Sequence, residues 1–370
     1  MTQDLLVHVA FMMGSIAFMM GLATVFTWVE RKQSAITSDR IGANRCYVRI
    51  PFTKIKFVAW GLFHGVADGG KLLLKENFIP NTYDRACYNL APWLVLAPVL
   101  FVFAVIPFGG TLTVGESSYA MQIAPIDAGV LFVLAISGVG ILGTMLAGWS
   151  SNNKFSLMGA ARAASQMISY ELTMGVTIIS MVITYGALDL NTMVQWQSGL
   201  LVGAVPAWGI LIQPVAFICF MTAGIAENKR IPFDLPECES ELVAGYFTEY
   251  TGMKMGVFML SEFIEIVVLG ALITTIFLGG YNLPYLTDAG FIFPGGYTWA
   301  LPQWTVVMMQ VATFGLKTFL VGCFMIQVRW TLPRFRYDQL MAFGWKFMLP
   351  LAVLNLVVTV CVRLLVGDHA

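Results

Sequence analysis

Long apolar stretches alternate with short polar connections along the whole chain. About 20 apolar residues cross the hydrocarbon core of a bilayer as an α-helix, and eight stretches of roughly that length stand out. These predicted spans are residues 6–29, 90–108, 128–149, 158–185, 206–226, 252–278, 305–328 and 345–366. The pattern predicts an all-α polytopic membrane protein, a single membrane domain over residues 1–370 with both ends of the chain on the same side.

The distribution of lysine and arginine over the connections predicts the orientation. The second, fourth and sixth connections (109–127, 186–205 and 279–304) contain no basic residue. The other connections hold nearly all the lysines and arginines, and the first of them is the richest. Because cytoplasmic loops carry the excess of positive charge, we expect both termini outside and the loops 30–89 and 227–251 inside. No basic segment precedes the first apolar stretch, so it is predicted to be retained as a span.

The bulk composition agrees with lipid as the main solvent. Hydrophobic residues make up 58% of the chain and charged residues 11%, whereas a soluble domain carries about 25% charged residues. The 21 basic and 21 acidic side chains cancel, so no nucleic acid is expected as a partner. The six cysteines show no C-x-x-C spacing and the three histidines lie outside the predicted spans or near the chain ends. We therefore expect no metal, cluster or haem in this chain.

The first inside loop contains a segment with helical spacing of apolar residues. Residues 54–76 (KIKFVAWGLFHGVADGGKLLLKE) carry lysines at each end and are predicted to form an amphipathic helix in the interface plane. Taken alone, this segment favours a surface anchor. The alternative is a half-buried wall beside the entrance for an amphiphilic substrate.

Ionisable residues inside the predicted spans each need an explanation, because a charge at the bilayer centre costs about 2.5–3.5 kcal/mol on insertion scales. Arg162 and Glu171 are nine residues apart and point to opposite sides of one helix. Glu262 and Glu265 are three apart and share a face, so we expect them to hold one proton between them. Lys317 needs a partner. Each could be a structural ion pair, but several in one bundle favour a proton path.

The connection after the fifth span is unusually acidic for an inside loop. Within AENKRIPFDLPECESELVAGYFTEYTGMK, its carboxylates are Glu227, Asp234, Glu237, Glu239, Glu241 and Glu249. They are interleaved with apolar residues and two prolines, which predicts a folded, partly buried segment rather than a solvated loop. It is interpreted as a funnel that collects protons or as a surface for a partner.

Several strings resemble one known family. ERK (30–32), ADGGKLLLKE (67–76), FSLMGAARAASQMISYELT (155–173), the 226–254 string, LKT (316–318) and TLPRFRYDQLM (331–341) resemble the H subunit of NADH–quinone oxidoreductase, the mitochondrial subunit 1 family of respiratory complex I. The match runs in order through nearly the whole chain. The 226–254 string and TLPRFRYDQLM are its most specific parts.

The resemblance implies a proton-pumping heel subunit that binds quinone as a substrate and carries no metal, flavin or haem of its own. Its implied partners are the other membrane-arm subunits, the cluster-bearing peripheral arm and the lipid of a bacterial inner membrane, or alternatively a mitochondrial one. The quinone chamber is implied at Glu30, Arg31, Asp68, Arg162, Phe233, Asp234, Glu237, Glu239 and Glu241. The residues of the implied proton path are Glu171, Glu227, Glu249 and Glu262, to which Lys317 is added because of its place within a span.

The chain departs from the family pattern at a few positions. Ala43 stands where proline is usual, His64-Gly65 replaces Gln-Pro, Cys238 replaces glycine, and Glu265 is an additional carboxylate. Two other functions compete. The first is the equivalent subunit of a membrane-bound hydrogenase or formate hydrogenlyase, although those relatives generally lack the ESELVAGYFTEY run. The second is an ion-coupled secondary transporter, whose internal repeats are not found here.

Overall fold

The computed structural model describes residues 2–49, 56–114, 117–202, 205–287, 290–292 and 297–366. Its α-helices are α1 Thr2–Thr37, α2 Phe63–Leu74, α3 Arg85–Phe103, α4 Gly129–Ser150, α5 Lys154–Tyr185, α6 Leu190–Trp196, α7 Gly209–Ile212, α8 Pro214–Glu227, α9 Glu239–Leu242, α10 Gly252–Phe277, α11 Gln303–Thr331, α12 Tyr337–Phe343 and α13 Leu349–Val366. Shorter turns are the 3₁₀ segments η1 Ala59–Gly61 and η2 Gly245–Phe247 and the π segment η3 Gly344–Met348.

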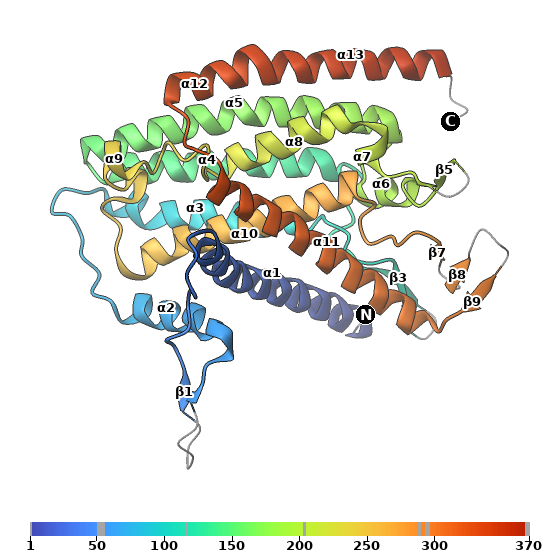
Figure 1. Cartoon of the computed structure of the whole chain (residues 1–370), viewed down its shortest axis with the longest axis horizontal. Coiled ribbons are helices and arrows are strands. Elements are labelled where there is room, and N and C mark those ends of the chain that lie inside the picture. Colours follow the sequence, from blue (N-terminus) through green and yellow to red (C-terminus); the bar gives the residue numbers. More distant parts are fainter. Residues whose placement is uncertain are drawn as a thin grey trace.

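The long helices lie side by side as one bundle (Figure 1). Within the described residues, seven helical segments are long and apolar enough to cross a membrane, namely α1, α3, α4, α5, α10, α11 and the continuous α12–α13 segment. The shorter apolar helix α8 runs among them. The prediction of an all-α polytopic membrane protein is therefore confirmed.

Helix α10 is the centre of the bundle. It packs against α1, α3, α8 and α11, and every residue from Ile266 to Phe277 is buried. Its most apolar stretch is 78% buried, compared with 11% for the α12–α13 segment. A helix that is apolar all round must be covered on all sides, so α10 lies within the protein, while α13 presents most of its surface to lipid or to a partner.

The fifth predicted span, 206–226, is not one helix. The chain forms α7, leaves the helical conformation at Gln213 (φ −132°, ψ 69°) and continues as α8. The residue before a proline is disfavoured in the helical region, and Pro214 follows Gln213. Polar side chains surround the break: the Gln213 amide donates to Thr184 Oγ1 (2.5 Å) and Thr359 Oγ1 (3.0 Å), and its oxygen accepts from Asn355 (3.1 Å). These bonds join the break to α5 and α13.

The predicted amphipathic helix at 54–76 is shorter than expected. Residues 54 and 55 lie outside the described part, and the helix α2 begins only at Phe63. Trp60 and Gly61 have positive φ values of 54° and 93°, which interrupts a helical path before that point. The apolar side chains of Val66, Leu73 and Leu74 are exposed, which agrees with a helix that lies at an interface.

Short antiparallel strands decorate the connections. The strands are β1 Val48–Arg49 paired with β2 Lys56–Phe57, β3 Thr111–Val114 with β4 Ser117–Ala120, β5 Leu200–Val202 with β6 Val205–Pro206, and β7 Leu286–Thr287, β8 Gly290–Ile292 and β9 Thr298–Ala300 in one sheet. The strands from β3 onward lie on the connections that lack lysine and arginine. Figure 1 places β5 and β7–β9 at the end of the bundle where α1 begins and α13 ends, and α2 and α9 at the opposite end.

The close contact of α4 with α5 gives a test of the packing. A Cβ atom at Gly148 would come within 2.3 Å of Ala160 Cβ and 2.6 Å of Ser156 O, whereas one at Gly140 would meet nothing within 4 Å. We expect Gly148→Ala to destabilise the protein by about 1–3 kcal/mol, because a well-packed contact must open. The matched control Gly140→Ala should be neutral or stabilising by up to about 1 kcal/mol. Thermal unfolding in mild detergent measures both, and equal midpoints would contradict the tight packing.

Candidate functional site

The acidic connection, residues 228–251 between α8 and α10, is folded against the bundle. The Phe233 ring packs against the rings of Tyr170 (5.8 Å between centroids) and Phe335 (5.6 Å). The side-chain amide of Gln166 on α5 donates to the carbonyl oxygens of Ala226 (2.8 Å) and Phe233 (2.7 Å). These contacts fix the course of the connection near Phe233, and they hold the neighbouring Arg230 and Asp234 in buried positions.

Arg230 is the centre of a buried ion-pair cluster that we call the arginine cluster (Glu30, Arg230, Glu262 and Arg329). Its guanidinium donates to Glu30 Oε2 at 2.5 Å and lies 3.9 Å from Glu262 Oε2. The other oxygen of Glu30 pairs with Arg329 at 2.6 Å. The side chain of Arg230 is 8% exposed and that of Glu30 is 14% exposed. Removing one member would leave an uncompensated buried charge, which is strongly destabilising.

Glu262 also faces the acidic connection. The Tyr246 hydroxyl donates to Glu262 Oε1 at 3.4 Å. Burial raises the pKa of Glu237 well above its usual range, and the neighbouring carboxylate of Glu262 raises it further. Among the described residues, Glu237 Oε1 has no hydrogen-bond partner. Burial and the neighbouring carboxylate therefore both favour the protonated form of Glu237.

Asp234 and Arg334 form a second pair at the same end. Arg334 Nη2 donates to Asp234 Oδ2 at 2.8 Å, and Arg334 Nη1 lies 3.3 Å from Cys238 Sγ. Burial raises the pKa of Asp234 to about 6, although the Arg334 guanidinium opposes this shift. Asp234 therefore exchanges its proton close to neutral pH.

A small cavity of about 60 Å³ lies next to these groups and is lined mostly by apolar side chains of α3, α4, α5 and α10. Its charged lining residues are Glu227, Lys229 and Glu265. Glu227 is 6% exposed, and its Oε2 atom has no partner among the described residues. Ser137 also lines the cavity and donates to Glu171 Oε1 at 2.9 Å. A volume of this size holds a few water molecules.

The predicted chamber residues of α1 and α2 meet each other. Arg31 on α1 is hydrogen-bonded to Asp68 on α2, and Lys71 lies 3.8 Å from the same carboxylate. A hollow of about 430 Å³ opens here, lined by Glu30, Arg31, Ser34, Arg40, Gly42, Ala43 and Trp330. Glu30 thus belongs both to this hollow and to the arginine cluster.

Arg162 and Glu241 form an outer pair at 2.5 Å that joins α5 to α9. Arg162 and Glu171 contact different neighbours, as their spacing predicts. Glu249 lies apart from the arginine cluster and accepts from the Asn153 amide at 2.6 Å. Glu239 is the first residue of α9, and its side chain lies outside the described part of the structure.

Lys317 does not join the carboxylates. Its ammonium donates to the carbonyl oxygens of Leu278 (2.7 Å), Gly280 (3.0 Å) and Asn282 (2.8 Å), and lies over the Trp208 ring. This position is at the carboxyl end of α10, 16 residues beyond Glu262, which corresponds to roughly 24 Å along a helix. Lys317 therefore satisfies carbonyl groups and the negative end of the α10 dipole.

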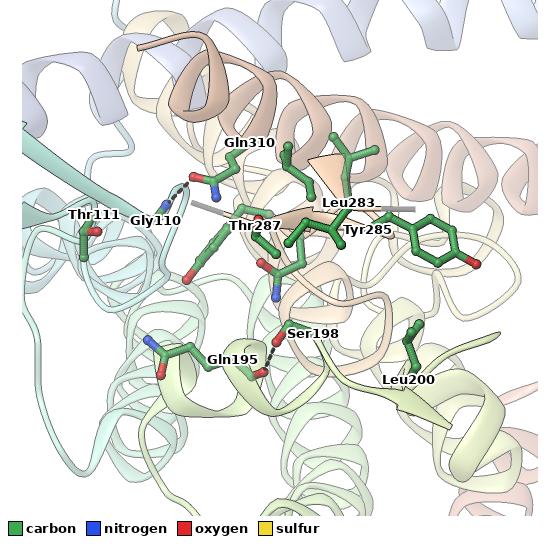
Figure 2. Close-up of a pocket in the computed structure, with 13 residues that line it drawn as sticks. Gly110, Thr111, Gln195, Ser198, Leu200, Leu283, Tyr285, Thr287 and Gln310 are labelled. Atoms are coloured by element: carbon green, nitrogen blue, oxygen red, sulfur yellow. Dashed lines mark hydrogen bonds between the residues drawn. The ribbon is translucent and has the colours of Figure 1, made fainter. Parts of the chain in front are cut away.

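A hollow at that opposite end differs from the site in its chemistry. It has a volume of about 480 Å³ and is lined by neutral groups from β3, α6, α11 and the β7–β8 region (Figure 2). The Gly110 amide donates to Gln310 Oε1 at 3.0 Å across one side of it. Among the described residues that line this hollow there is no carboxylate or basic side chain. Within the described residues, no three His, Cys, Asp or Glu side chains are grouped to hold a metal ion.

Sequence reasoning found the carboxylates of the site but missed their partners. Arg230, Arg329 and Arg334 were predicted only as basic residues of inside loops, and Tyr246 was not singled out. The available signal was the pair Lys229-Arg230, two residues after Glu227, because basic residues near buried acids are expected to pair with them.

Comparison with known proteins shows the family of this chain. The family model described as NADH dehydrogenase matches residues 9–360. An H subunit of NADH-quinone oxidoreductase from Cytophaga hutchinsonii is 42% identical over 338 residues, which is 91% of each chain. An H subunit of the same enzyme from Geobacter metallireducens is 40% identical over 96% of each chain, and that of Thermomicrobium roseum is 41% identical over 94% of this chain and 93% of its own. Identity at this level over this length is decisive, and the chain belongs to the NADH dehydrogenase family.

Proposed function

We propose that this chain is the membrane subunit of a proton-pumping NADH–quinone oxidoreductase that forms the quinone chamber and the first part of the proton-coupling path. The observation that carries the proposal is the group of buried carboxylates around Arg230, held by a folded connection at one end of the bundle. The names of the relatives supply the reaction, and the residues of this chain supply its coupling to protons.

Quinone reduction creates the demand for protons. A quinone that accepts two electrons becomes a dianion and takes up two protons to form the quinol. The electrons come from a cluster in a partner subunit, since the donor site is not in this chain. Negative charge that develops in the hollow beside Glu30 and Arg31 favours protonation of nearby carboxylates such as Asp234, because like charges disfavour the ionised form.

The contacts of the site suggest a route away from the quinone. Arg31, Asp68 and α2 border the entrance for the quinone, and Glu30 connects the hollow to the arginine cluster. Asp234 and Glu237 take up protons first, and their change in charge alters the protonation of Glu262 next to them. The cavity with Glu227 and the Ser137–Glu171 pair continues the route into the membrane. We place Glu239, Glu241 and Arg162 at the surface where the chamber meets its partners, with Glu249 beside the route.

The surroundings follow from the same proposal. The end that carries α2 and α9 faces the inside and docks the cluster-bearing peripheral arm, with both termini outside. The exposed apolar faces contact lipid or the other membrane-arm subunits, in the inner membrane of a bacterium. Nucleic acid has no place in this arrangement.

The break between α7 and α8 is the one feature that favours a secondary transporter, since such proteins build substrate sites at broken helices. Here the side chains of Gln213, Thr184, Asn355 and Thr359 are bonded to each other across the break. That mutual bonding leaves the NADH–quinone oxidoreductase subunit as the better proposal. The named relatives likewise favour it over a hydrogenase component.

Substitution of Glu227 tests the proton path. Glu227→Gln should lower quinone-linked proton pumping on the order of 100-fold, the loss expected when a proton-transfer group is removed. Glu262→Gln should do the same, although it also removes a partner of Arg230. Electron flow from NADH to an artificial acceptor should continue, because that site lies in another subunit. The measurement is pumping by the complex in sealed vesicles, normalised to acceptor reduction.

Glu76→Gln is the matched control, because Glu76 is an exposed carboxylate outside the cluster. It should pump at the rate of the unaltered complex. Equal loss of pumping and acceptor reduction in the Glu227 variant would mean that this residue serves assembly, and the proposed path would then be wrong.

The Asp234–Arg334 pair predicts how the pKa of Asp234 changes when the arginine is removed. Arg334→Gln removes the guanidinium that lowers the pKa of Asp234, so this pKa should rise above about 6, by about one unit or more. Asp234 would then keep its proton to higher pH. Infrared difference spectra of the carboxyl band, followed over pH and assigned with Asp234→Asn, measure the midpoint.

The neighbouring Arg336→Gln is the control for that titration. Arg336 pairs with Asp338 at 2.7 Å, and both side chains are exposed, so the midpoint of Asp234 should not move. The same shift in both variants, or none in Arg334→Gln, would show that Arg334 does not set the protonation of Asp234.

A further inference from the structure

Glu265 is a carboxylate of the site that the proposed proton path does not include. It lies on α10 almost one turn after Glu262, but the two acids have different surroundings. Glu262 faces Arg230 and Tyr246, whereas Glu265 lines the small cavity together with Glu227. The pairing of Glu262 with Glu265 stays a prediction, and the cavity gives Glu265 a second candidate partner in Glu227.

Two further observations join Glu265 to Glu227. The Asn228 side chain, in the amide orientation that satisfies both its atoms, donates to Glu265 Oε2 at 3.3 Å and to the Glu262 carbonyl oxygen at 3.2 Å. Asn228 follows Glu227 directly, so this bond holds the end of α8 against α10. Glu227 Oε2 is buried at the cavity and has no partner within the described part of the chain. A buried polar atom of this kind needs a proton or a water molecule.

The charges around the cavity do not balance if both acids are ionised. Besides each other, both acids have a further carboxylate nearby. Glu171 on α5 acts on Glu227, and Glu262 on α10 acts on Glu265. The positive groups that face the pair are Lys229 and Arg230. Arg230 is already paired with Glu30 and Glu262. Lys229, whose ammonium lies 5.0 Å from the centroid of the Tyr246 ring, can compensate one carboxylate of the cavity but not two.

We propose that Glu227 and Glu265 form a proton-sharing pair, in which Glu265 is an additional proton carrier of this chain. The inference rests on the proposed proton path and adds a residue to it. In the transfer step, the carboxylic acid of Glu227 gives its proton to the carboxylate of Glu265, directly or through water in the cavity. One proton and one negative charge remain on the pair throughout: the proton moves from Glu227 on α8 to Glu265 on α10, and the negative charge is left on Glu227.

The glutamine variant separates this role from a structural one. In Glu265→Gln the amide oxygen can still accept from Asn228, so the contact between α8 and α10 is kept while the ionisable group is lost. The neutral amide also no longer repels the charge of Glu227. We therefore expect the alkaline limb of the pH profile of pumping to move to lower pH by about one unit, the coupling typical of interacting acids.

The experiment compares intact complexes with Glu265→Gln, Glu227→Gln or Glu76→Gln in sealed vesicles. Pumping driven by NADH and a short-chain quinone is measured from acid to alkaline pH, and the band of protonated carboxyl groups is followed by infrared difference spectroscopy. Glu265→Gln should move the alkaline limb and remove the band of the shared proton, and Glu76→Gln should change neither.

The outcomes distinguish the two proposals. If Glu227→Gln abolishes pumping while Glu265→Gln keeps the original profile and band, the pair is refuted and the proton path stands. If neither variant affects pumping, the path itself fails. Should the glutamine variant not assemble, Glu265→Asp takes its place: its shorter side chain widens the gap to Glu227, so the limb should move in the same direction, and an unmoved limb would overturn the pair.

Discussion

The guanidinium of Arg230 lies between Glu30 of α1 and Glu262 of α10, with the ring of Phe263 beneath it at 4.3 Å. This contact joins parts of the chain that are far apart in the sequence. A buried charge is tolerated only when it is paired and hydrogen-bonded, so each member of the arginine cluster requires the others to be in position. The folded acidic connection, the inner ends of α1 and α11 and the central helix α10 are held in one arrangement by this requirement.

The same requirement explains why protons can be handled here at all. Around Arg230 the positive and negative charges are matched, but Asp234, Glu237, Glu227 and Glu265 add carboxylates for which fewer cations are present. In water these acids would ionise independently. In this low-dielectric environment the excess of negative charge favours protonation of some of these carboxylates. A new negative charge nearby therefore changes how many protons the four acids hold together. Under the proposed function, this surplus of buried carboxylates is what would make the protonation of these helices respond to electron transfer next to them.

Much of the fold could be predicted because a helix that crosses lipid must be a long, mostly apolar stretch of sequence. Spans such as 128–149 and 252–278 match α4 and α10 to within one residue at each end, since length and hydropathy decide them. The span 206–226 was wrong in its interior, because the preference of one residue before Pro214 overrode a continuous apolar pattern. The helix at 54–76 was too long because the periodicity of apolar residues does not report the positive φ values at Trp60 and Gly61.

The site could be predicted in its residue types but not in its pairings. Buried carboxylates are visible in a sequence, whereas the partner of each acid depends on contacts between distant helices. Lys317 is an example of a partner that the sequence does not reveal. A lysine within an apolar span is expected to pair with a carboxylate, but this ammonium donates to backbone carbonyls at the end of α10. Glu262 and Glu265 share a helix face, but residues of α8 and of the segment that follows it give the two carboxylates different neighbours.

The tight seam between α4 and α5 has a mechanical consequence. With only the hydrogen of Gly148 between the two backbones near Ala160 and Ser156, we expect these helices to tilt together when a bilayer thins or thickens, rather than to slide past each other. The hydroxyl of Ser137 on one helix therefore stays aligned with the carboxylate of Glu171 on the other. Fluctuations of the surrounding lipid leave that donor and acceptor in register.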